Sequence, residues 1–424
     1  MISDIELVLK KLFSLQRLGI KVGLEHTEEL LSKIGEPHKK LKCIHIAGTN
    51  GKGSTCAIIN KILIEHGLVV GLYTSPHLVR FNERIQINGV KISDEYIAKF
   101  MMENSHHIKK IKTTFFETTT AMALDYFYKK SVDIAIIETG LGGRLDSTNV
   151  IFPLVCGITS ISLDHMDILG NTIEKISKEK SGIIKNNIPI VTFEQSNSII
   201  EIISEKAKSK NAQMTIIKNE DIDLIKIDRY NSQFRYKNYK ISLPLKGEHQ
   251  VINCALAINI AEKILDKINP HNVKKAINKT YWPGRMEKLS DKNIYYDVAH
   301  NYDGIKSMIK SVNIYHPRKK LVGLFCVKAD KNIVSICSLL KKYFYKIIIC
   351  QDKQKYLLSI NKLSKIMKDQ KINYLSVGSV EEGLNIIDSM DQEEFVGLVF
   401  GSHYISEEVY YGYGKHFDTN YNLM

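Results

Sequence analysis

Residues 41–55 place three glycines and one lysine between a short apolar run and an amphipathic pattern. The run Cys43–Ala47 predicts a buried strand, and the periodicity of 54–66 predicts a helix. Glycines let backbone N–H groups approach phosphate oxygens, and a helix N-terminus favours anions. Lys52 would meet the terminal phosphates of a nucleotide. The segment therefore predicts a phosphate-binding loop.

The spacing within this loop differs from the usual G-x-x-x-x-G-K-[ST] pattern. Gly48 lies three residues before Gly51, and Gly53 separates Lys52 from Ser54. A glycine-rich turn without a ligand is the alternative interpretation, so the rest of the chain has to decide between the two.

Glu138 ends a second apolar run, 132–137, and is followed by a glycine-rich stretch at 139–149. In open α/β sheets ligands bind beyond the carboxyl ends of the strands, which is also where Lys52 would lie. A carboxylate at this edge could bind a Mg²⁺ that bridges ATP phosphates. An ordinary strand-end glutamate in solvent is the alternative.

His165 and Lys180 are more ambiguous. His165 follows the run 155–162 and could either ligate a metal or cap the next element. Lys180 lies near the end of a helical pattern at 171–184, where the pattern alone indicates a solvated lysine.

Thr114, Phe115, Phe116 and Glu117 precede an apolar helix expected at 118–127. Aromatic rings beside a carboxylate could bind a flat heterocycle, although core packing is the default role of the two phenylalanines.

Polar side chains in the last third of the chain could complete a nucleotide site. Asn253 opens a helix and could contact an adenine edge or be purely structural. Arg285 follows a Pro-Gly turn and could reach a phosphate. Asp297 and His300 end another strand-like run, again at the ligand-binding edge.

Other chemistries lack their patterns. The chain has no Ser-His-Asp order, no zinc-ligand spacing and no G-x-G-x-x-G after its first strand. The residues therefore favour phosphate chemistry with Mg²⁺ over hydrolysis or hydride transfer.

The elements that must position these residues alternate between short apolar runs and amphipathic helices, which predicts an α/β fold with a mostly parallel sheet. At 230–245, aromatic residues alternate with polar ones and indicate an antiparallel hairpin. The segment 281–284 holds the single tryptophan and a Pro-Gly turn, so we place a domain junction there. The expected domains are 1–282 and 283–424.

Composition is that of a globular protein, with 44% hydrophobic and 25% charged residues in 424 positions. No run approaches the roughly 18 apolar residues of a membrane span, and seven scattered cysteines argue against a disulfide framework. We expect a cytoplasmic protein with no membrane partner. The net charge of +13 comes from dispersed lysines without interleaved aromatic residues, so nucleic-acid binding is not expected.

Taken together, the segments resemble the folylpolyglutamate synthase/dihydrofolate synthase family of the Mur ligase superfamily. The matching motifs follow the family order across nearly the whole chain, at 48–54, 74–78, 82–84, 116–117, 138–146, 163–165, 179–180, 247–250, 283–285, 297–301 and 401–402.

This resemblance implies an N-terminal ATPase domain of the Mur ligase type with a P-loop, and a smaller Rossmann-like C-terminal domain. It implies a ligase that joins L-glutamate to dihydropteroate, to tetrahydrofolate polyglutamate or to both, through an acyl phosphate. ATP would be the co-substrate, with two Mg²⁺ ions and a carbamylated Lys180 that serves as a metal ligand. The protein would be a monomer acting on small molecules.

The resemblance also implies the role of each site residue. Catalytic roles fall to Lys52, Lys180 and His300. The ATP-binding residues would be Gly51, Lys52, Gly53, Ser54, Asn253, Arg285 and Asp297. The metal ligands would be Ser75, Glu138, His165 and Lys180. The pterin or folate would contact Thr114, Phe115, Phe116, Glu117, Leu145, Asp146 and Ser147.

Two other functions stay open at this point. One is a Mur-type ligase that extends a cell-wall nucleotide precursor, and the other is a nucleotide-binding module without catalysis. The sequence does not decide between one ligase activity and two. It also leaves the preferred one-carbon form, the polyglutamate length and the modification of Lys180 undetermined.

Overall fold

An eight-stranded sheet forms the centre of the N-terminal lobe in the computed structural model, which describes residues 5–19 and 23–415. The strand order is β4-β3-β2-β5-β1-β6-β7-β8, and every pairing is parallel except those of β3 with β2 and β4. The strands are β1 (Cys43–Ala47), β2 (Val70–Tyr73), β3 (Ile85–Ile87), β4 (Val90–Lys91), β5 (Ile134–Glu138), β6 (Val155–Ile158), β7 (Ile190–Phe193) and β8 (Met214–Ile217).

Helices cover both faces of this sheet, which explains why its central strands are apolar throughout. The helices α3, α10 and α11 share one core with β1, β2 and β5, while α2, α4, α5 and α6 pack into the core on the opposite face. The helices of this lobe are α1 (Ile5–Ser14), α2 (Glu25–Lys33), α3 (Lys52–Glu65), α4 (Asp94–Glu103), α5 (Ser105–Ile111), α6 (Phe115–Lys129), α7 (Met166–Leu169), α8 (Ile173–Ser181), α9 (Asn197–Ser209), α10 (Glu248–Glu262) and α11 (Pro270–Asn278). Short 3₁₀ helices are η1 (Leu15–Leu18), η2 (Pro37–Lys39), η3 (Phe81–Arg84), η4 (Ser147–Val150) and η5 (Asn219–Asp221).

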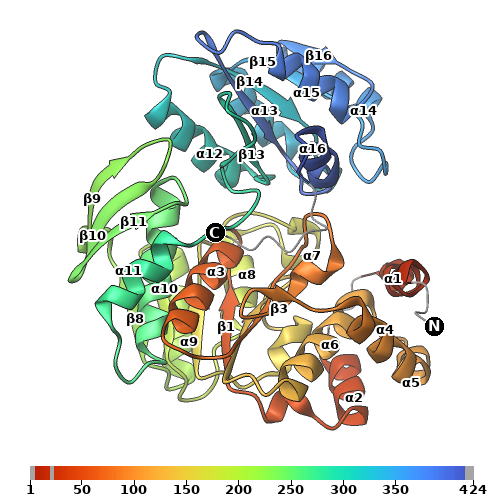
Figure 1. The fold of residues 1–424 in the computed structure, drawn as a ribbon, viewed down its shortest axis with the longest axis vertical. Coiled ribbons are helices and arrows are strands. Elements are labelled where there is room, and N and C mark those ends of the chain that lie inside the picture. The colour runs from red at the N-terminus through yellow and green to blue at the C-terminus, as the bar shows by residue number, and fades with distance from the viewer. Residues whose placement is uncertain (1–4, 20–22, 416–424) are drawn as a thin grey trace.

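A separate antiparallel sheet lies beside α10 and α11, at the left of the view in Figure 1. Its strands are β9 (Ile222–Ile227), β10 (Ser232–Tyr236) and β11 (Tyr239–Leu243). The hairpin predicted at 230–245 is formed by β10 and β11, with Tyr236 opposite Tyr239.

The C-terminal lobe is a six-stranded sheet with order β12-β13-β17-β14-β15-β16, drawn above the first lobe in Figure 1. Only β12 is antiparallel to its neighbour. The strands are β12 (Glu287–Lys288), β13 (Ile294–Asp297), β14 (Lys320–Phe325), β15 (Phe344–Ile349), β16 (Tyr374–Ser376) and β17 (Phe395–Phe400). The helices are α12 (Tyr302–Tyr315), α13 (Ile333–Tyr343), α14 (Ile360–Asp369), α15 (Val380–Asp388) and α16 (Ser406–Gly412).

The predicted α/β class with a mostly parallel sheet is confirmed. Two predicted helix starts were wrong in the same direction. Helix α3 begins at Lys52 rather than at residue 54, and α6 begins at Phe115 rather than at 118. In the described part of the chain, no helix is long and apolar enough to cross a bilayer.

Candidate active site

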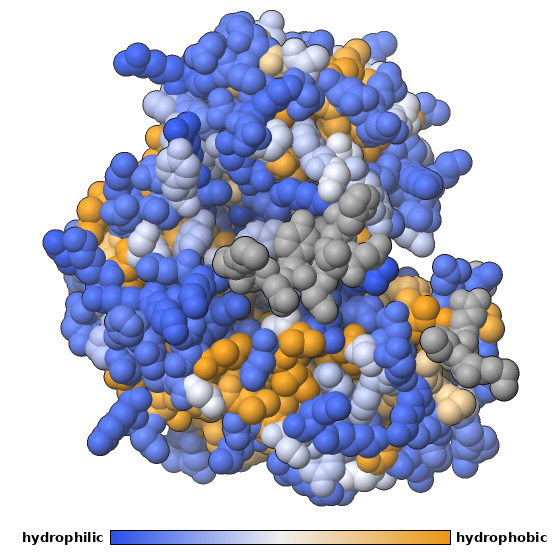
Figure 2. All heavy atoms as spheres, in the orientation of Figure 1, coloured by the Kyte–Doolittle hydropathy of each residue, from blue (hydrophilic) through white to orange (hydrophobic). Residues whose placement is uncertain are grey.

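A cavity of about 1460 Å³ lies between the two lobes, at the carboxyl ends of β1, β5 and β13. Figure 2 shows a notch between the upper and lower parts of a mostly hydrophilic face. Of the residues assigned to the site from sequence, only Glu117 does not line the cavity. The lining includes Gly51, Lys52, Gly53, Ser54, Ser75, Thr114, Phe115, Phe116, Glu138, Leu145, Asp146, Ser147, His165, Lys180, Asn253, Arg285, Asp297 and His300.

The side chain of Lys52 folds back onto the backbone of the glycine-rich loop. Lys52 Nζ donates hydrogen bonds to the carbonyl oxygens of Gly48 (3.1 Å) and Thr49 (3.2 Å). Gly51 has φ +92°, and a Cβ there would lie 2.5 Å from Oδ1 of Asn253. The loop therefore requires glycine at this position, both for its backbone conformation and for the approach of α10.

The next turn carries two further features. The Ser54 hydroxyl is buried and has no hydrogen-bond partner among the described residues, as expected for a group that awaits a phosphate oxygen or a cation. A Cβ on Gly53 would lie 2.9 Å from Nε1 of Trp282, so the indole of the interlobe junction packs directly on the loop.

Glu138 is buried at the end of β5, with 3% of its surface exposed. One carboxylate oxygen accepts a hydrogen bond from the Ser75 backbone N–H at 3.2 Å. Burial raises the pKa of Glu138 to about 7, although Lys52 opposes the shift. The alternative of a solvated strand-end glutamate is wrong, because the strand ends inside the cleft.

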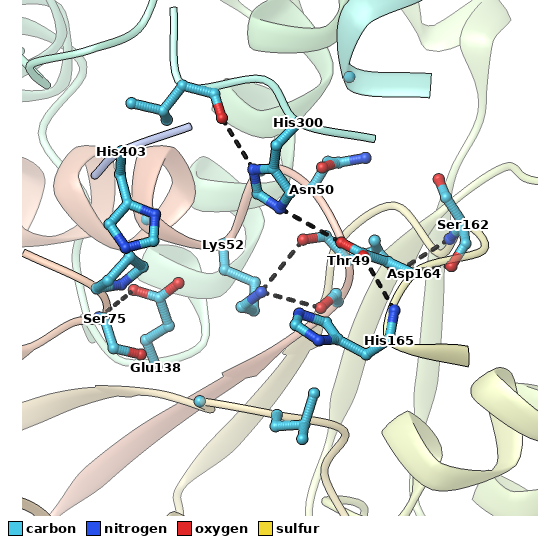
Figure 3. A pocket seen from close by; sticks show the side chains of 18 of the residues that line it. Thr49, Asn50, Lys52, Ser75, Glu138, Ser162, Asp164, His165, His300 and His403 are labelled. Carbon is cyan, nitrogen blue, oxygen red and sulfur yellow. Dashed lines mark hydrogen bonds and ion pairs between the residues drawn. The ribbon is translucent and has the colours of Figure 1, made fainter. Parts of the chain in front are cut away.

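His165 has a left-handed backbone (φ +50°) and precedes α7, but its side chain makes no capping hydrogen bond. Figure 3 shows Lys52 pointing between Glu138 and His165. Burial lowers the pKa of His165 to about 4, so its ring is neutral at neutral pH and can act as a ligand.

These groups suit a Mg²⁺ that is shared with a nucleotide. Within 5–19 and 23–415, no three histidine, cysteine, aspartate or glutamate side chains cluster to hold an ion by themselves. Mg²⁺ commonly binds through one or two carboxylates plus substrate phosphates, and the buried Glu138 carboxylate that lines the cavity fits that pattern.

The helical pattern alone indicated that Lys180 is solvated, and that prediction is wrong. It is 4% exposed, and its Nζ donates a hydrogen bond of 2.8 Å to the Gly48 carbonyl, across 132 positions of sequence. Burial, followed by the charge of Lys52, lowers the pKa of Lys180 to about 7. The last turn of α8 therefore places an amine against the glycine-rich loop.

Thr114 and Glu117 form a capping box at the start of α6. Glu117 donates its backbone N–H to the Thr114 hydroxyl (3.4 Å), and its carboxylate accepts the Thr114 N–H (2.6 Å). Glu117 also lies 3.4 Å from His26 and is 2% exposed. Its carboxylate is thus engaged in positioning Phe115 and Phe116, which do line the cavity.

Asp146 has a similar local role beside the cavity. Its carboxylate accepts hydrogen bonds from the N–H groups of Leu141 (2.7 Å) and Thr148 (3.0 Å). These bonds hold the glycine-rich stretch after β5 in place, so that Leu145 and Ser147 face the cavity.

The C-terminal lobe contributes Arg285, Asp297 and His300. Asp297 accepts N–H hydrogen bonds from Met286 and Ala299, at 2.9 and 2.8 Å, which ties the turn that carries Arg285 to the end of β13. The Arg285 Nε is buried without a hydrogen-bond partner among the described residues. His300 donates Nδ1–H to the Val298 carbonyl, which leaves Nε2 to face Asp164 at 3.4 Å.

An interlobe contact around Asp164 was not predicted. Lys331 Nζ lies 2.6 Å from the Asp164 carboxylate, and both side chains are less than a tenth exposed. Burial alone would raise the pKa of Asp164, but His300 and Lys331 outweigh it and hold that pKa well below its usual range. Asn301 adds hydrogen bonds to Asn50 (3.1 Å) and Asp164 (3.0 Å). In the sequence, Lys331 lies a few residues after a strand-like run, which does not distinguish it from the other lysines of the chain.

Replacing Glu287 with glutamine is expected to lower the free energy of unfolding by about 2–3 kcal/mol at pH 7. This buried carboxylate accepts hydrogen bonds from the Gly284 N–H (3.0 Å), Tyr410 Oη (2.6 Å) and Lys415 Nζ (2.9 Å). Lys415 and these hydrogen bonds hold the pKa of Glu287 below its ordinary 4.5, against the effect of burial. Its contribution is therefore complete above that value and is lost as the pH falls through the folded pKa.

Urea unfolding of both proteins at pH 7 and at pH 3.5 measures this difference, which should shrink at the lower pH. The control is Glu394→Gln, because that carboxylate pairs with Lys320 at the surface and should contribute less than about 1 kcal/mol. A difference that does not change with pH would contradict the assignment.

The chain matches the family model "Mur ligase middle domain" over residues 46–261. It is 38% identical over 334 residues to the dihydrofolate synthase/folylpolyglutamate synthase of Bacillus subtilis, covering 74% of this chain and 77% of that protein. It is 32% identical over 409 residues to the enzyme of the same name from Buchnera aphidicola, covering 94% and 92%.

Among solved structures, the chain is similar to Mycobacterium tuberculosis folylpolyglutamate synthase complexed with ADP and AMPPCP. The TM-score is 0.89 at 26% identity, over 97% of this chain and 100% of that one. The likeness therefore extends across both lobes and the cleft between them.

Proposed function

The chain belongs to the folylpolyglutamate synthase/dihydrofolate synthase family of Mur ligases, and we propose on that basis how its cleft joins L-glutamate to a folate-type acid. It is an ATP-dependent ligase of dihydropteroate, of tetrahydrofolate polyglutamate or of both. The observation that carries the proposal is that Lys52, Glu138, Lys180 and Arg285, from distant parts of the sequence, line one cavity.

The reaction begins at the acid. A carboxylate is a poor electrophile until one of its oxygens becomes a leaving group. That oxygen attacks the γ-phosphorus of ATP, ADP departs, and an acyl phosphate forms. The amine of glutamate then attacks the acyl carbon, loses a proton, and expels inorganic phosphate as the amide forms.

The loop and the C-terminal lobe bind the nucleotide from opposite sides. Lys52 neutralises charge on the transferring phosphoryl group, while the N–H groups of Gly51, Gly53 and Ser54 surround the phosphates. Arg285 would reach the same phosphates from across the cleft, on a turn that the Met286 N–H ties to Asp297, and Asn253 would complete the nucleotide pocket. His300 lies on the side where the C-terminal lobe meets Asp164, and it orients the incoming amine.

Ser75, Glu138 and His165 would hold Mg²⁺ together with the nucleotide phosphates. The ion would neutralise phosphate charge there. Two such ions would bind. The burial of the Glu138 carboxylate supports a cationic partner at that position.

Lys180 would carry a carbamate. An amine that is buried against the glycine-rich loop is costly as an ammonium, and its conversion to a carbamate would give a carboxylate-like ligand in the cavity that Glu138 and His165 also line. The serine that follows at position 181 donates its hydroxyl to the Ser177 carbonyl at 2.7 Å, so that hydroxyl does not engage the Lys180 amine.

The acid would lie on the other side of Glu138. Thr114, Phe115 and Phe116 line that part of the cavity with Leu145, Asp146 and Ser147, while Glu117 shapes it from within α6. We place the domain boundary at 282/283. The chain would act as a cytoplasmic monomer on small molecules, without nucleic acid or membrane, and its seven buried free cysteines suit a reducing compartment.

Phosphate release from ATP tests this function, with L-glutamate and one acid at a time: dihydropteroate, tetrahydrofolate or a uridine-linked peptide precursor. Release should require both glutamate and a folate-type acid. Release with dihydropteroate alone or with tetrahydrofolate alone would indicate one ligase activity, and release with each of them would indicate two. Activity with the uridine-linked precursor alone would identify a cell-wall ligase. ATP binding without any release would identify a binding module.

A further inference from the structure

Arg84 is a buried cation beside the aromatic end of the cavity. It ends η3, is 7% exposed, and lines the same cavity as the phosphate loop. Its guanidinium carbon lies 5.2 Å from the centroid of the Phe115 ring. Phe13 stacks on Phe115 at a centroid distance of 5.5 Å and also lines the cavity, so aromatic rings surround the approach to the guanidinium.

Among the described residues no carboxylate forms an ion pair or hydrogen bond with this guanidinium, and Glu83 and Glu138 act on it only through longer-range electrostatics. The neighbouring acid, Glu83, accepts backbone hydrogen bonds from Leu78 (2.8 Å), Val79 (3.0 Å) and Arg80 (2.6 Å) instead. A buried arginine without an anion is costly, so a site that keeps one is arranged for an anion from outside.

The hydrogen bond between the guanidinium and His77 fixes which nitrogen of the His77 ring carries the proton. Arg84 Nε donates to His77 Nδ1 at 2.7 Å. Because arginine is only a donor, Nδ1 of His77 must accept, and the ring proton must lie on Nε2. His77 lines the cavity as well, so two N–H donor groups converge beside the aromatic wall.

We propose that Arg84 and His77 bind the carboxylate of the aromatic acid and position it for phosphorylation. The inference rests on the proposed function and adds a recognition site to it. A flat aryl acid would place its ring among Phe13 and Phe115 and its carboxylate on the guanidinium fork, which matches carboxylates bidentately. The carboxylate would then point toward Glu138 and the phosphate loop, where ATP is bound.

The test compares binding of pteroate with binding of its carboxamide, in the presence of a non-hydrolysable ATP analogue. The parent protein should bind the carboxylate about tenfold or more tightly than the amide. Arg84→Met should bring the ratio of dissociation constants close to one, and Arg84→Lys should give an intermediate ratio. The ratio of the two dissociation constants reports recognition of the charge, because partial misfolding would weaken the binding of both ligands alike.

Arg80→Met is the matched control, since Arg80 is exposed in the same segment and does not line the cavity; it should keep the parental ratio. Unchanged discrimination in Arg84→Met, or in Arg84→Lys if the first variant does not fold, would overturn the proposal. The proposal would also be overturned if Arg84→Met raised the KM for glutamate and still preferred pteroate over its carboxamide, because Arg84 and His77 would then bind glutamate. If the parent protein makes product but does not prefer the carboxylate over the amide, only the assignment of Arg84 and His77 is refuted. If it shows no folate-dependent phosphate release, the proposed function is refuted.

Discussion

Replacing Lys52 with alanine is expected to abolish ATP-dependent glutamate ligation, with kcat/KM falling by about 10³-fold. Lys52 is the only cation in the loop, and its ammonium already lies over the carbonyls of Gly48 and Thr49. Without it, the backbone N–H groups alone would face the charge that develops on the transferring phosphoryl group. Phosphate release with saturating glutamate and folate-type acid measures the loss.

Lys61→Ala is the control, because Lys61 belongs to the same helix but does not line the cavity. It should retain the parental rate. Near-normal turnover in Lys52→Ala would refute the assignment of the loop as the phosphate site, whatever the affinity for ATP.

Replacing Lys180 with alanine should also inactivate the enzyme, yet acetate or another short carboxylate should restore part of the activity. The reason is the sign of the charge: a carbamylated lysine is an anion, so a small carboxylate can enter the space that alanine leaves. Rescue should rise with acetate concentration until it saturates, and an equal concentration of chloride should not produce it. Steady-state rates across an acetate series measure this.

Lys178→Ala controls for changes in the helix, since Lys178 is exposed on α8 two residues earlier. It should need no acetate. Rescue of Lys180→Ala by a small amine rather than by a carboxylate would mean that the position acts as a cation, and would remove the carbamate from the mechanism.

Strands at the centre of the sheets were predictable because burial on both faces leaves an unbroken apolar run. The run Cys43–Ala47 coincides with β1 residue for residue. Helix starts were less well placed. The start of α6 was missed although Thr114 and Glu117 have the spacing of a capping box, which is visible in sequence.

The site itself could be predicted only as a set of candidates. Strand ends and glycine-rich turns identified the edge of the sheet where ligands bind. They could not show that Lys180 is buried, because the carbonyl that it contacts lies 132 positions away. The pairing of Lys331 with Asp164 spans 167 positions and two lobes, and no local pattern encodes such a contact.

The contact between Trp282 and Gly53 gives the protein a built-in optical probe. Trp282 is the only tryptophan of the chain, so all tryptophan fluorescence of the protein comes from one ring. That ring lies on the turn expected to surround the phosphates. Titration with nucleotide should therefore change the intensity or the wavelength of this emission without any added label, and a stopped-flow trace would time the arrival of nucleotide at the loop.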